Sequence, residues 1–241
     1  MKQTSLISNK NIPVRERLIL ALDVPSVAEA KQWVTRFGDA VCFYKLGLEL
    51  FMTGSYFELV DWLQQRNKKI FIDLKFFDVP ETVGAAVRQL KNSGAVFATV
   101  HGNDSILQAA VAEKNDLKVL AVTVLTSLDE HDLQDLGFAC DPKTLVLSRA
   151  KRALQIGCDG VISSGLEAAA LRSTLGERLL IITPGIRPVA NVDDQKRVVD
   201  VEQAFMNGAD YIVMGRPIRN AADPRAAAEA IQQRIAALFA D

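Results

Sequence analysis

Short runs of apolar residues recur along the chain, separated by longer stretches in which apolar residues return with helical spacing. Short runs without polar alternation are typical of parallel strands that are buried on both faces. The pattern predicts eight such strands, over residues 18–23, 41–46, 69–76, 95–101, 117–126, 160–163, 179–184 and 211–216.

The stretches between these runs carry signals for helix starts at Ser26, Pro80 and Asp223-Pro224. Strands and helices that alternate in this way predict an α/β fold, and eight repeats predict a closed (β/α)8 TIM barrel. A doubly wound sheet uses the same alternation and stays open as an alternative. We expect a single domain over residues 1–241, with residues 1–15 as a flexible N-terminal arm.

Charged residues stand inside the predicted third strand. Side chains alternate along a strand, and apolar residues belong under the helices, so Asp73 and Lys75 should point into the barrel with Phe71. Both lie near the carboxyl end of the strand, where barrel enzymes build their active sites.

The same alternation directs Asp23 inward on the first strand, and on the second strand it directs inward Val41, Phe43 and Lys45. Since the first three strands are neighbours in a barrel, Asp23, Lys45, Asp73 and Lys75 should form one cluster of alternating charge. A structural ion-pair network is the alternative interpretation. Four charged residues of matching parity on consecutive strands favour a functional site. His101, at the end of the fourth strand, is interpreted as a structural, hydrogen-bonding histidine.

The ends of the seventh and eighth strands, Pro184-Gly185-Ile186-Arg187 and Gly215-Arg216, lie where many barrels bind a phosphate. Glycine lets its backbone N–H approach a phosphate oxygen, and arginine adds paired, charged hydrogen bonds. The polar stretch over residues 187–195 has the length of a lid. These features predict a phosphorylated small molecule as ligand.

The composition of the chain limits the classes of partner and the cellular compartment that we expect for the protein. The 28 Lys and Arg residues nearly balance the 29 Asp and Glu residues, so net charge offers no argument for binding nucleic acid or a membrane surface. Cys42, Cys140 and Cys158 are odd in number and form no CxxC pair, as expected in the reducing cytoplasm. No stretch near the N-terminus is apolar enough for a signal peptide or a membrane span.

One motif resembles a known family. Asp73-Leu74-Lys75-Phe76-Phe77-Asp78, followed by Val79-Pro80-Glu81-Thr82, is similar to the Asp-x-Lys-x-x-Asp signature of the orotidine 5′-phosphate decarboxylases. The resemblance runs nearly end to end, because further segments stand in the family's order: Leu22-Asp23, Tyr44-Lys45-Leu46-Gly47, Val124-Leu125-Thr126-Ser127, Pro184-Gly185-Ile186-Arg187, Asp194-Gln195 and Gly215-Arg216-Pro217.

The resemblance implies a bacterial-type enzyme that converts orotidine 5′-phosphate to UMP in pyrimidine biosynthesis without a cofactor or metal. It implies that Asp23 and Lys45 bind the ribose and that Lys75 is the catalytic cation beside Asp73. It also implies a homodimer in which two residues reach the partner's site, Asp78 and Thr82. Thr126 and Ser127 would contact the pyrimidine ring, and the phosphate site would comprise Pro184, Arg187, Gln195, Gly215 and Arg216.

Two rival functions remain. Related 3-keto-gulonate-6-phosphate decarboxylases and hexulose-phosphate synthases share the motif but use Mg²⁺, held partly by a Glu at the end of the second strand. Lys45 stands there instead, and its ammonium would repel a metal cation. A binding-only barrel is the second rival, but such a protein has no need for a lysine among carboxylates.

Overall fold

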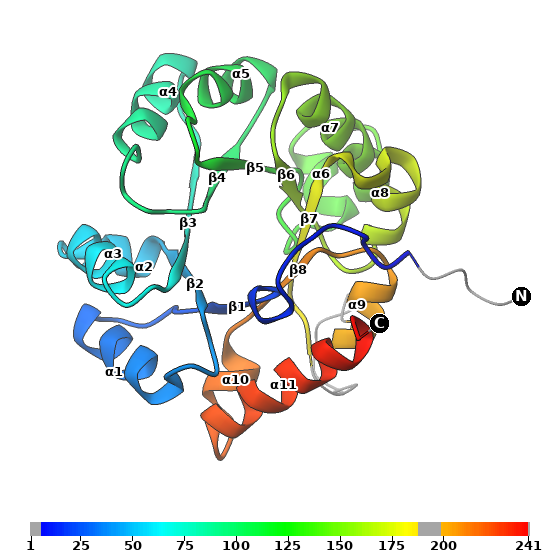
Figure 1. The fold of residues 1–241 in the computed structure, drawn as a ribbon. Coiled ribbons are helices and arrows are strands. Elements are labelled where there is room, and N and C mark those ends of the chain that lie inside the picture. Colours follow the sequence, from blue (N-terminus) through cyan, green and yellow to red (C-terminus); the bar gives the residue numbers. More distant parts are fainter. Residues whose placement is uncertain (1–5, 188–198, 241) are drawn as a thin grey trace, which may run out of the picture.

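The computed structural model describes residues 6–187 and 199–240, and in these residues eight parallel strands close into a barrel in sequence order (Figure 1). The predicted TIM barrel is therefore confirmed, and the open, doubly wound sheet is excluded. The strands are β1 Leu18–Ala21, β2 Phe43–Gly47, β3 Lys69–Phe76, β4 Phe97–His101, β5 Lys118–Val122, β6 Gly160–Ile162, β7 Leu180–Pro184 and β8 Tyr211–Met214.

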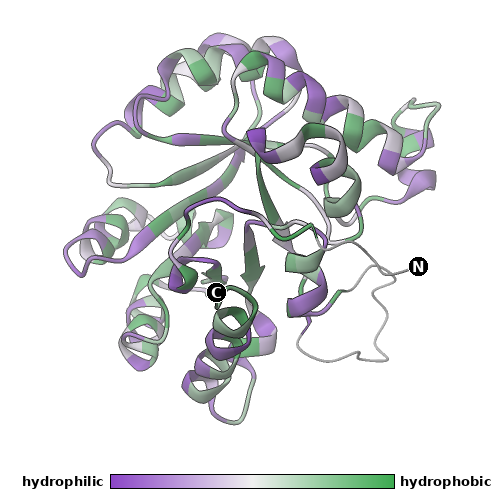
Figure 2. Ribbon diagram, turned by 45° about the vertical axis from the view of Figure 1, so that its right-hand side comes forward, coloured by the Kyte–Doolittle hydropathy of each residue, from purple (hydrophilic) through white to green (hydrophobic). Residues whose placement is uncertain are grey.

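Helices surround the strands, with their polar faces outward (Figure 2). They are α1 Val27–Phe37, α2 Leu48–Phe51, α3 Tyr56–Gln64, α4 Pro80–Gln89, α5 Asp104–Glu113, α6 Glu130–Asp135, α7 Pro142–Ile156, α8 Ala168–Leu175, α9 Val201–Met206, α10 Arg216–Arg219 and α11 Pro224–Leu238, with 3-10 turns η1 Val14–Glu16 and η2 Gly176–Arg178. The predicted helix starts hold, because Ser26 and Asp223 accept hydrogen bonds from backbone N–H groups of the first turns of α1 and α11, and Pro80 opens α4.

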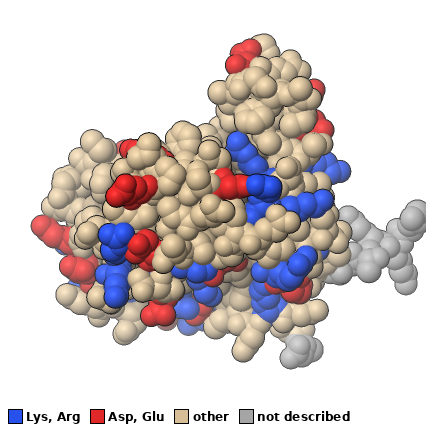
Figure 3. Space-filling view, turned by 90° about the horizontal axis from the view of Figure 1, so that it is seen from above, with Lys and Arg blue, Asp and Glu red and all other residues tan. Residues whose placement is uncertain are grey.

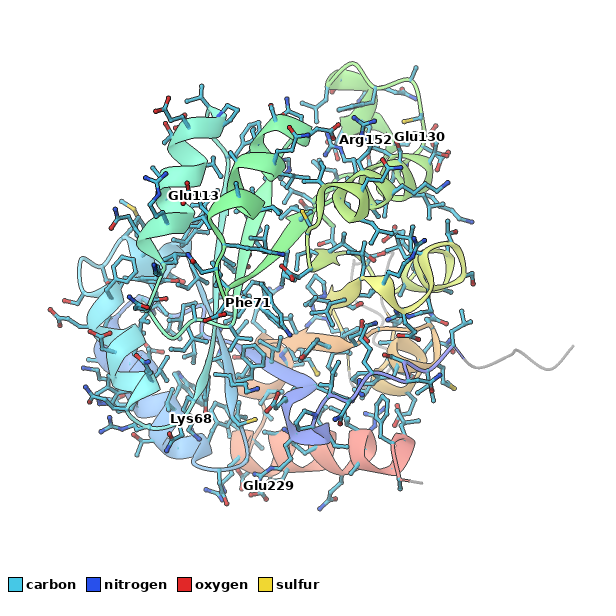
Figure 4. The ribbon with its side chains drawn as sticks, turned by 45° about the horizontal axis from the view of Figure 1, so that its top comes forward. Lys68, Phe71, Glu113, Glu130, Arg152 and Glu229 are labelled. Atoms are coloured by element: carbon cyan, nitrogen blue, oxygen red, sulfur yellow. The ribbon has the colours of Figure 1, made fainter. Side chains whose placement is uncertain are left out.

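Two apolar layers hold the fold together. The layer inside the barrel includes Phe43, Phe71, Phe97 and Tyr211, and Figure 4 labels Phe71 near the barrel axis. The larger layer fills the space between the strands and the helices. Val41 belongs to this outer layer, so its predicted inward direction is wrong: β2 begins only at Phe43, and the alternation does not extend back to residue 41.

Several strands end earlier than predicted, because the chain turns away into the loops that form the catalytic end of a barrel. Asp23 lies beyond the end of β1, and β5 stops at Val122 rather than at Thr126. Arg216 begins the short helix α10 rather than ending β8. Most of the functional candidates therefore lie on strand ends and on the loops that follow them, whereas Arg216 and Thr82 lie in the first turns of α10 and α4.

The N-terminal segment closes the opposite end of the barrel, where it crosses the strands as the blue trace in Figure 1. Lys10 Nζ donates to Glu177 at 2.8 Å and to the Asp210 carboxylate, which also accepts from Arg172 at 2.7 Å. Residues 1–5 lie outside the described residues. Lys10, which falls within the arm expected over residues 1–15, thus contacts a buried carboxylate.

Candidate active site

The four predicted charged residues meet at the carboxyl ends of β1, β2 and β3. Lys45 Nζ donates to Asp23 Oδ1 at 3.0 Å and lies 3.3 Å from Asp73 Oδ2. Lys75 Nζ lies 3.0 Å from Asp73 Oδ1. Positive and negative groups thus alternate along the cluster, as the strand parity predicted.

Asp73 is the centre of this cluster and is only 8% exposed. Burial disfavours its carboxylate and is the largest single influence, but Lys45 and Lys75, with the hydrogen bonds to the carboxylate, outweigh it and hold the pKa below its ordinary value. Burial likewise disfavours the ammonium of Lys45, yet Asp73 and Asp23 raise its pKa. Both groups are therefore charged at neutral pH.

The main chain of β3 is irregular at the cluster. The pairing register between β3 and β4 shifts between Ile72 and Phe76. Lys75 adopts a φ of 49°, in the left-handed region that a side chain with a Cβ rarely occupies. The backbone N–H of Lys75 donates to Thr99 Oγ1 at 2.9 Å, and the same hydroxyl donates to Asp73 Oδ1 at 2.9 Å. Thr99 was not predicted from the sequence, although its inward parity between Phe97 and His101 on β4 was a usable signal.

Two adjoining cavities open at this end of the barrel. The inner one, of about 230 Å³, is lined by the charged groups Lys45, Asp73 and Lys75 and by apolar residues such as Val122 and Ile162. The outer one, of about 880 Å³, shares Lys45, Thr126, Pro184 and Val213 with the inner cavity and extends to the ends of β7 and β8. Together they offer a charged, narrow end and a wider, more polar end.

Most of the predicted binding residues line the outer cavity. The structure brings to it the following predicted residues: Asp23, Thr126, Ser127, Pro184, Arg187, Gly215 and Arg216. Gln195 and the predicted lid lie outside the described residues, apart from Arg187. Asp78 and Thr82 are exposed, and neither lines either of these two cavities.

Gly215 lies where the chain passes close to β1. A Cβ built at this position would lie 3.3 Å from the Ala21 Cβ and 3.9 Å from Asp23 Oδ2. A side chain here would therefore crowd the wall of the cavity between β1 and β8, and glycine keeps the backbone accessible.

The loop between β5 and α7 contributes residues that sequence analysis did not single out. Leu128, Asp129, Glu130 and His131 line the outer cavity, and α6 begins within this loop after a capping box at Asp129. The length of the polar stretch between the fifth and sixth predicted strands was the available signal.

His101 does not fit the expected hydrogen-bonding role at Nδ1, which is buried without a partner in the described part of the chain. Its ring instead packs edge-on against Phe77, with centroids 5.2 Å apart. Burial, followed by the charges of Arg149 and Lys75, lowers its pKa, so the imidazole is neutral at neutral pH.

Among residues 6–187 and 199–240, no three His, Cys, Asp or Glu side chains gather in a way that could hold a metal ion. No helix within these residues is long and apolar enough to cross a membrane.

Comparison with known proteins identifies the family. Residues 16–231 match the model of the orotidine 5′-phosphate decarboxylase / HUMPS family. The chain belongs to this family. It is 64% identical over 238 residues to orotidine 5′-phosphate decarboxylase of Methylococcus capsulatus, covering 98% of both chains, and 50% identical to that of Stenotrophomonas maltophilia, covering 97% of this chain and 99% of the other.

Solved structures agree with this assignment. The crystal structure of orotidine 5′-phosphate decarboxylase from Lactobacillus acidophilus superposes with a TM-score of 0.82 at 35% identity, covering 91% of this chain and 99% of that chain. The enzyme of the same name from Pyrococcus horikoshii gives a TM-score of 0.72 at 27% identity, covering 90% of this chain and 98% of that chain.

Proposed function

We propose that this protein decarboxylates orotidine 5′-phosphate to UMP, a step of pyrimidine biosynthesis, without a metal or organic cofactor. The observation that carries the proposal is the Lys75 ammonium at the inner cavity, 3.0 Å from the buried carboxylate of Asp73. The family and its similar members, named for this reaction, support the same assignment.

The chemistry needs a fixed cation. When the bond between C6 and the carboxylate breaks, carbon dioxide leaves and the electron pair stays on C6 as a carbanion. Lys75 stabilises this charge and then donates a proton to C6, which gives UMP, and water restores the proton to the lysine. A preorganised charge in a site shielded from water is an effective way to stabilise such an intermediate.

Asp73 has two tasks in this proposal. It holds the Lys75 ammonium in place through the contact at 3.0 Å. Its carboxylate also lies on the side from which carbon dioxide departs, so that repulsion between the two carboxylates raises the energy of the bound substrate.

Substrate binding divides between the two cavities. Asp23 and Lys45, joined at 3.0 Å, bind the ribose hydroxyls. Thr126 and Ser127 contact the pyrimidine ring at the inner end of the outer cavity. The phosphate lies at the ends of β7 and β8, bound by the remaining predicted residues Pro184, Arg187, Gln195, Gly215 and Arg216.

We further propose a homodimer with its sites at the subunit interface. Asp78 and Thr82 are exposed and line neither of the two cavities, which leaves both accessible to a partner subunit. Large apolar side chains lie exposed on the neighbouring segments, with Phe77 at 67% and Met52 at 79% exposure, and a partner would cover them.

The chain's near-neutral charge and its unpaired cysteines support a cytoplasmic enzyme with a small-molecule partner. Acidic and basic side chains are interspersed on the face of the molecule that Figure 3 draws.

The test is a turnover assay with orotidine 5′-phosphate after treatment with excess EDTA. We expect full activity, because Lys45 holds its ammonium between Asp23 and Asp73, where a metal-using relative would have a carboxylate. Loss of activity on chelation that Mg²⁺ restores would reject the cofactor-free reaction. Binding of the nucleotide without turnover would favour the binding-only barrel.

A further inference from the structure

Thr99 links the two central residues of the site without lining either cavity. It lies on β4, fully buried. Its hydroxyl oxygen accepts the backbone N–H of Lys75 at 2.9 Å, and its single hydroxyl proton is then available for Asp73 Oδ1, also at 2.9 Å. The direction of both hydrogen bonds is therefore fixed, because an N–H can only donate and a carboxylate can only accept.

The irregular pairing of β3 explains why a side chain is needed here. Ile72 pairs with Ala98 and Phe76 pairs with Val100, so residues 73–75 of β3 stand opposite Thr99 alone. Such a bulge interrupts the ladder of backbone hydrogen bonds and redirects the side chains that it carries. The Thr99 hydroxyl gives the Lys75 N–H a partner at the point of interruption, where Lys75 also takes its left-handed φ of 49°.

We propose that Thr99 is a positioning residue for decarboxylation, which orients the Asp73 carboxylate and fixes the main chain of Lys75. The inference rests on the proposed roles of Asp73 and Lys75. Three donors from three strands converge on this carboxylate: Thr99 and Lys75 reach Oδ1, and Lys45 reaches Oδ2. Two of these donors are long, flexible lysines, whereas threonine is short and stiff at χ1. Thr99 is therefore the member that sets the plane of the carboxylate.

The test compares Thr99→Val, which keeps the shape and removes the hydroxyl, with Thr99→Ser, which keeps the hydroxyl and removes the methyl. We expect Thr99→Val to lower kcat about ten- to a hundredfold, the effect of losing one buried hydrogen bond to a charged group. KM and the affinity for UMP should change by less than about threefold, since the hydroxyl of Thr99 bonds Lys75 and Asp73, neither of which lines the outer cavity. Thr99→Ser should restore kcat to near the wild-type value.

Thr183→Val is the matched control. Thr183 is also a fully buried strand threonine, but its hydroxyl has no hydrogen-bond partner in the described part of the chain. The control should keep the wild-type kcat. If Thr99→Val does not fold, Thr99→Ala and Thr99→Ser give the same comparison, because they differ by the hydroxyl alone.

Lys75→Ala, measured beside these variants, separates the role of Thr99 from the proposed catalytic roles of Asp73 and Lys75. A wild-type kcat in Thr99→Val, or an equal loss of kcat in Thr99→Ser, would overturn the role of Thr99 while leaving an inactive Lys75→Ala in agreement with the proposed reaction. An active Lys75→Ala would overturn the proposed catalytic roles and the inference together.

Discussion

Lys45 and Lys75 both contact Asp73, but they differ in exposure and in their number of ion-pair partners, which indicates different roles. The Lys45 side chain is 13% exposed and its ammonium contacts two carboxylates, those of Asp23 and Asp73. The Lys75 side chain is 36% exposed, and among the described residues its ammonium forms an ion pair with Asp73 alone. An ammonium has three hydrogens to donate. Lys75 therefore retains donors that face the cavity, which fits a cation that acts on the substrate.

Replacement of this cation tests its role. We expect Lys75→Ala to fold and to bind UMP, but to lose much more than the roughly hundredfold in kcat that removal of one oxyanion donor costs. The measurement is kcat together with a melting curve and UMP titration. Lys118→Ala, which removes an exposed lysine from the other end of a strand, is the control and should keep full activity. A Lys75→Ala enzyme within about tenfold of wild type would contradict the assignment.

At the scale of elements, the short apolar runs were enough to predict the eight strands, and the alternation of side chains along a strand was enough to place Asp73 and Lys75 on one side of β3. It could not predict the bulge in β3, because the extra residues are defined only by pairing with β4. Thr99 was not predicted for this reason, because its role depends on residues 73–75, which lie opposite it in the neighbouring strand. The role of Lys10 likewise depends on residues far away in the sequence. Its sequence context is typical of an exposed lysine, but its ammonium contacts the buried Asp210.

The elements at the amino end of the barrel depend on Asp210, whose side chain is fully buried. It accepts from Arg172 of α8 at 2.7 Å and from the backbone N–H of Ile181 in β7 at 2.8 Å. We expect Asp210→Asn to lower the free energy of unfolding by about 3–5 kcal/mol, because it removes the buried carboxylate that pairs with Arg172 and Lys10 and leaves Arg172 with the more exposed Glu177. Denaturant titration measures this loss.

The activity of Asp210→Asn gives a second readout. The residue precedes β8, at the end of the barrel opposite the site, so kcat of the folded enzyme should be unchanged. Glu229→Gln is the control, since Glu229 forms an exposed pair with Arg225 on α11 (Figure 4) and should cost less than about 1 kcal/mol. Equal stability of the two variants would show that the buried network adds nothing to the fold.

At the scale of the whole molecule, the residues of the Asp-x-Lys-x-x-Asp motif do not all line the cavity of their own chain. Asp73 and Lys75 face the cavity of their own chain, whereas Asp78, three residues further on, is exposed beside Phe77 and Val79. An exposed carboxylate flanked by large apolar side chains is unusual on a surface that meets only water. A second copy of the chain that covers this surface would bury the apolar groups and receive the carboxylate in its site.

Mixing two inactive variants tests whether sites are shared. A dimer of Asp78→Ala and Lys75→Ala chains has one site with both substitutions and one site with neither. If subunits exchange freely, half of the dimers are hybrids with one intact site of two, so about a quarter of the wild-type site activity should return. The measurement is turnover after mixing, with each variant alone as control and the hybrid fraction determined separately. Verified hybrids without recovered activity would show that Asp78 serves its own chain's site, since an intact shared site would be present in every hybrid.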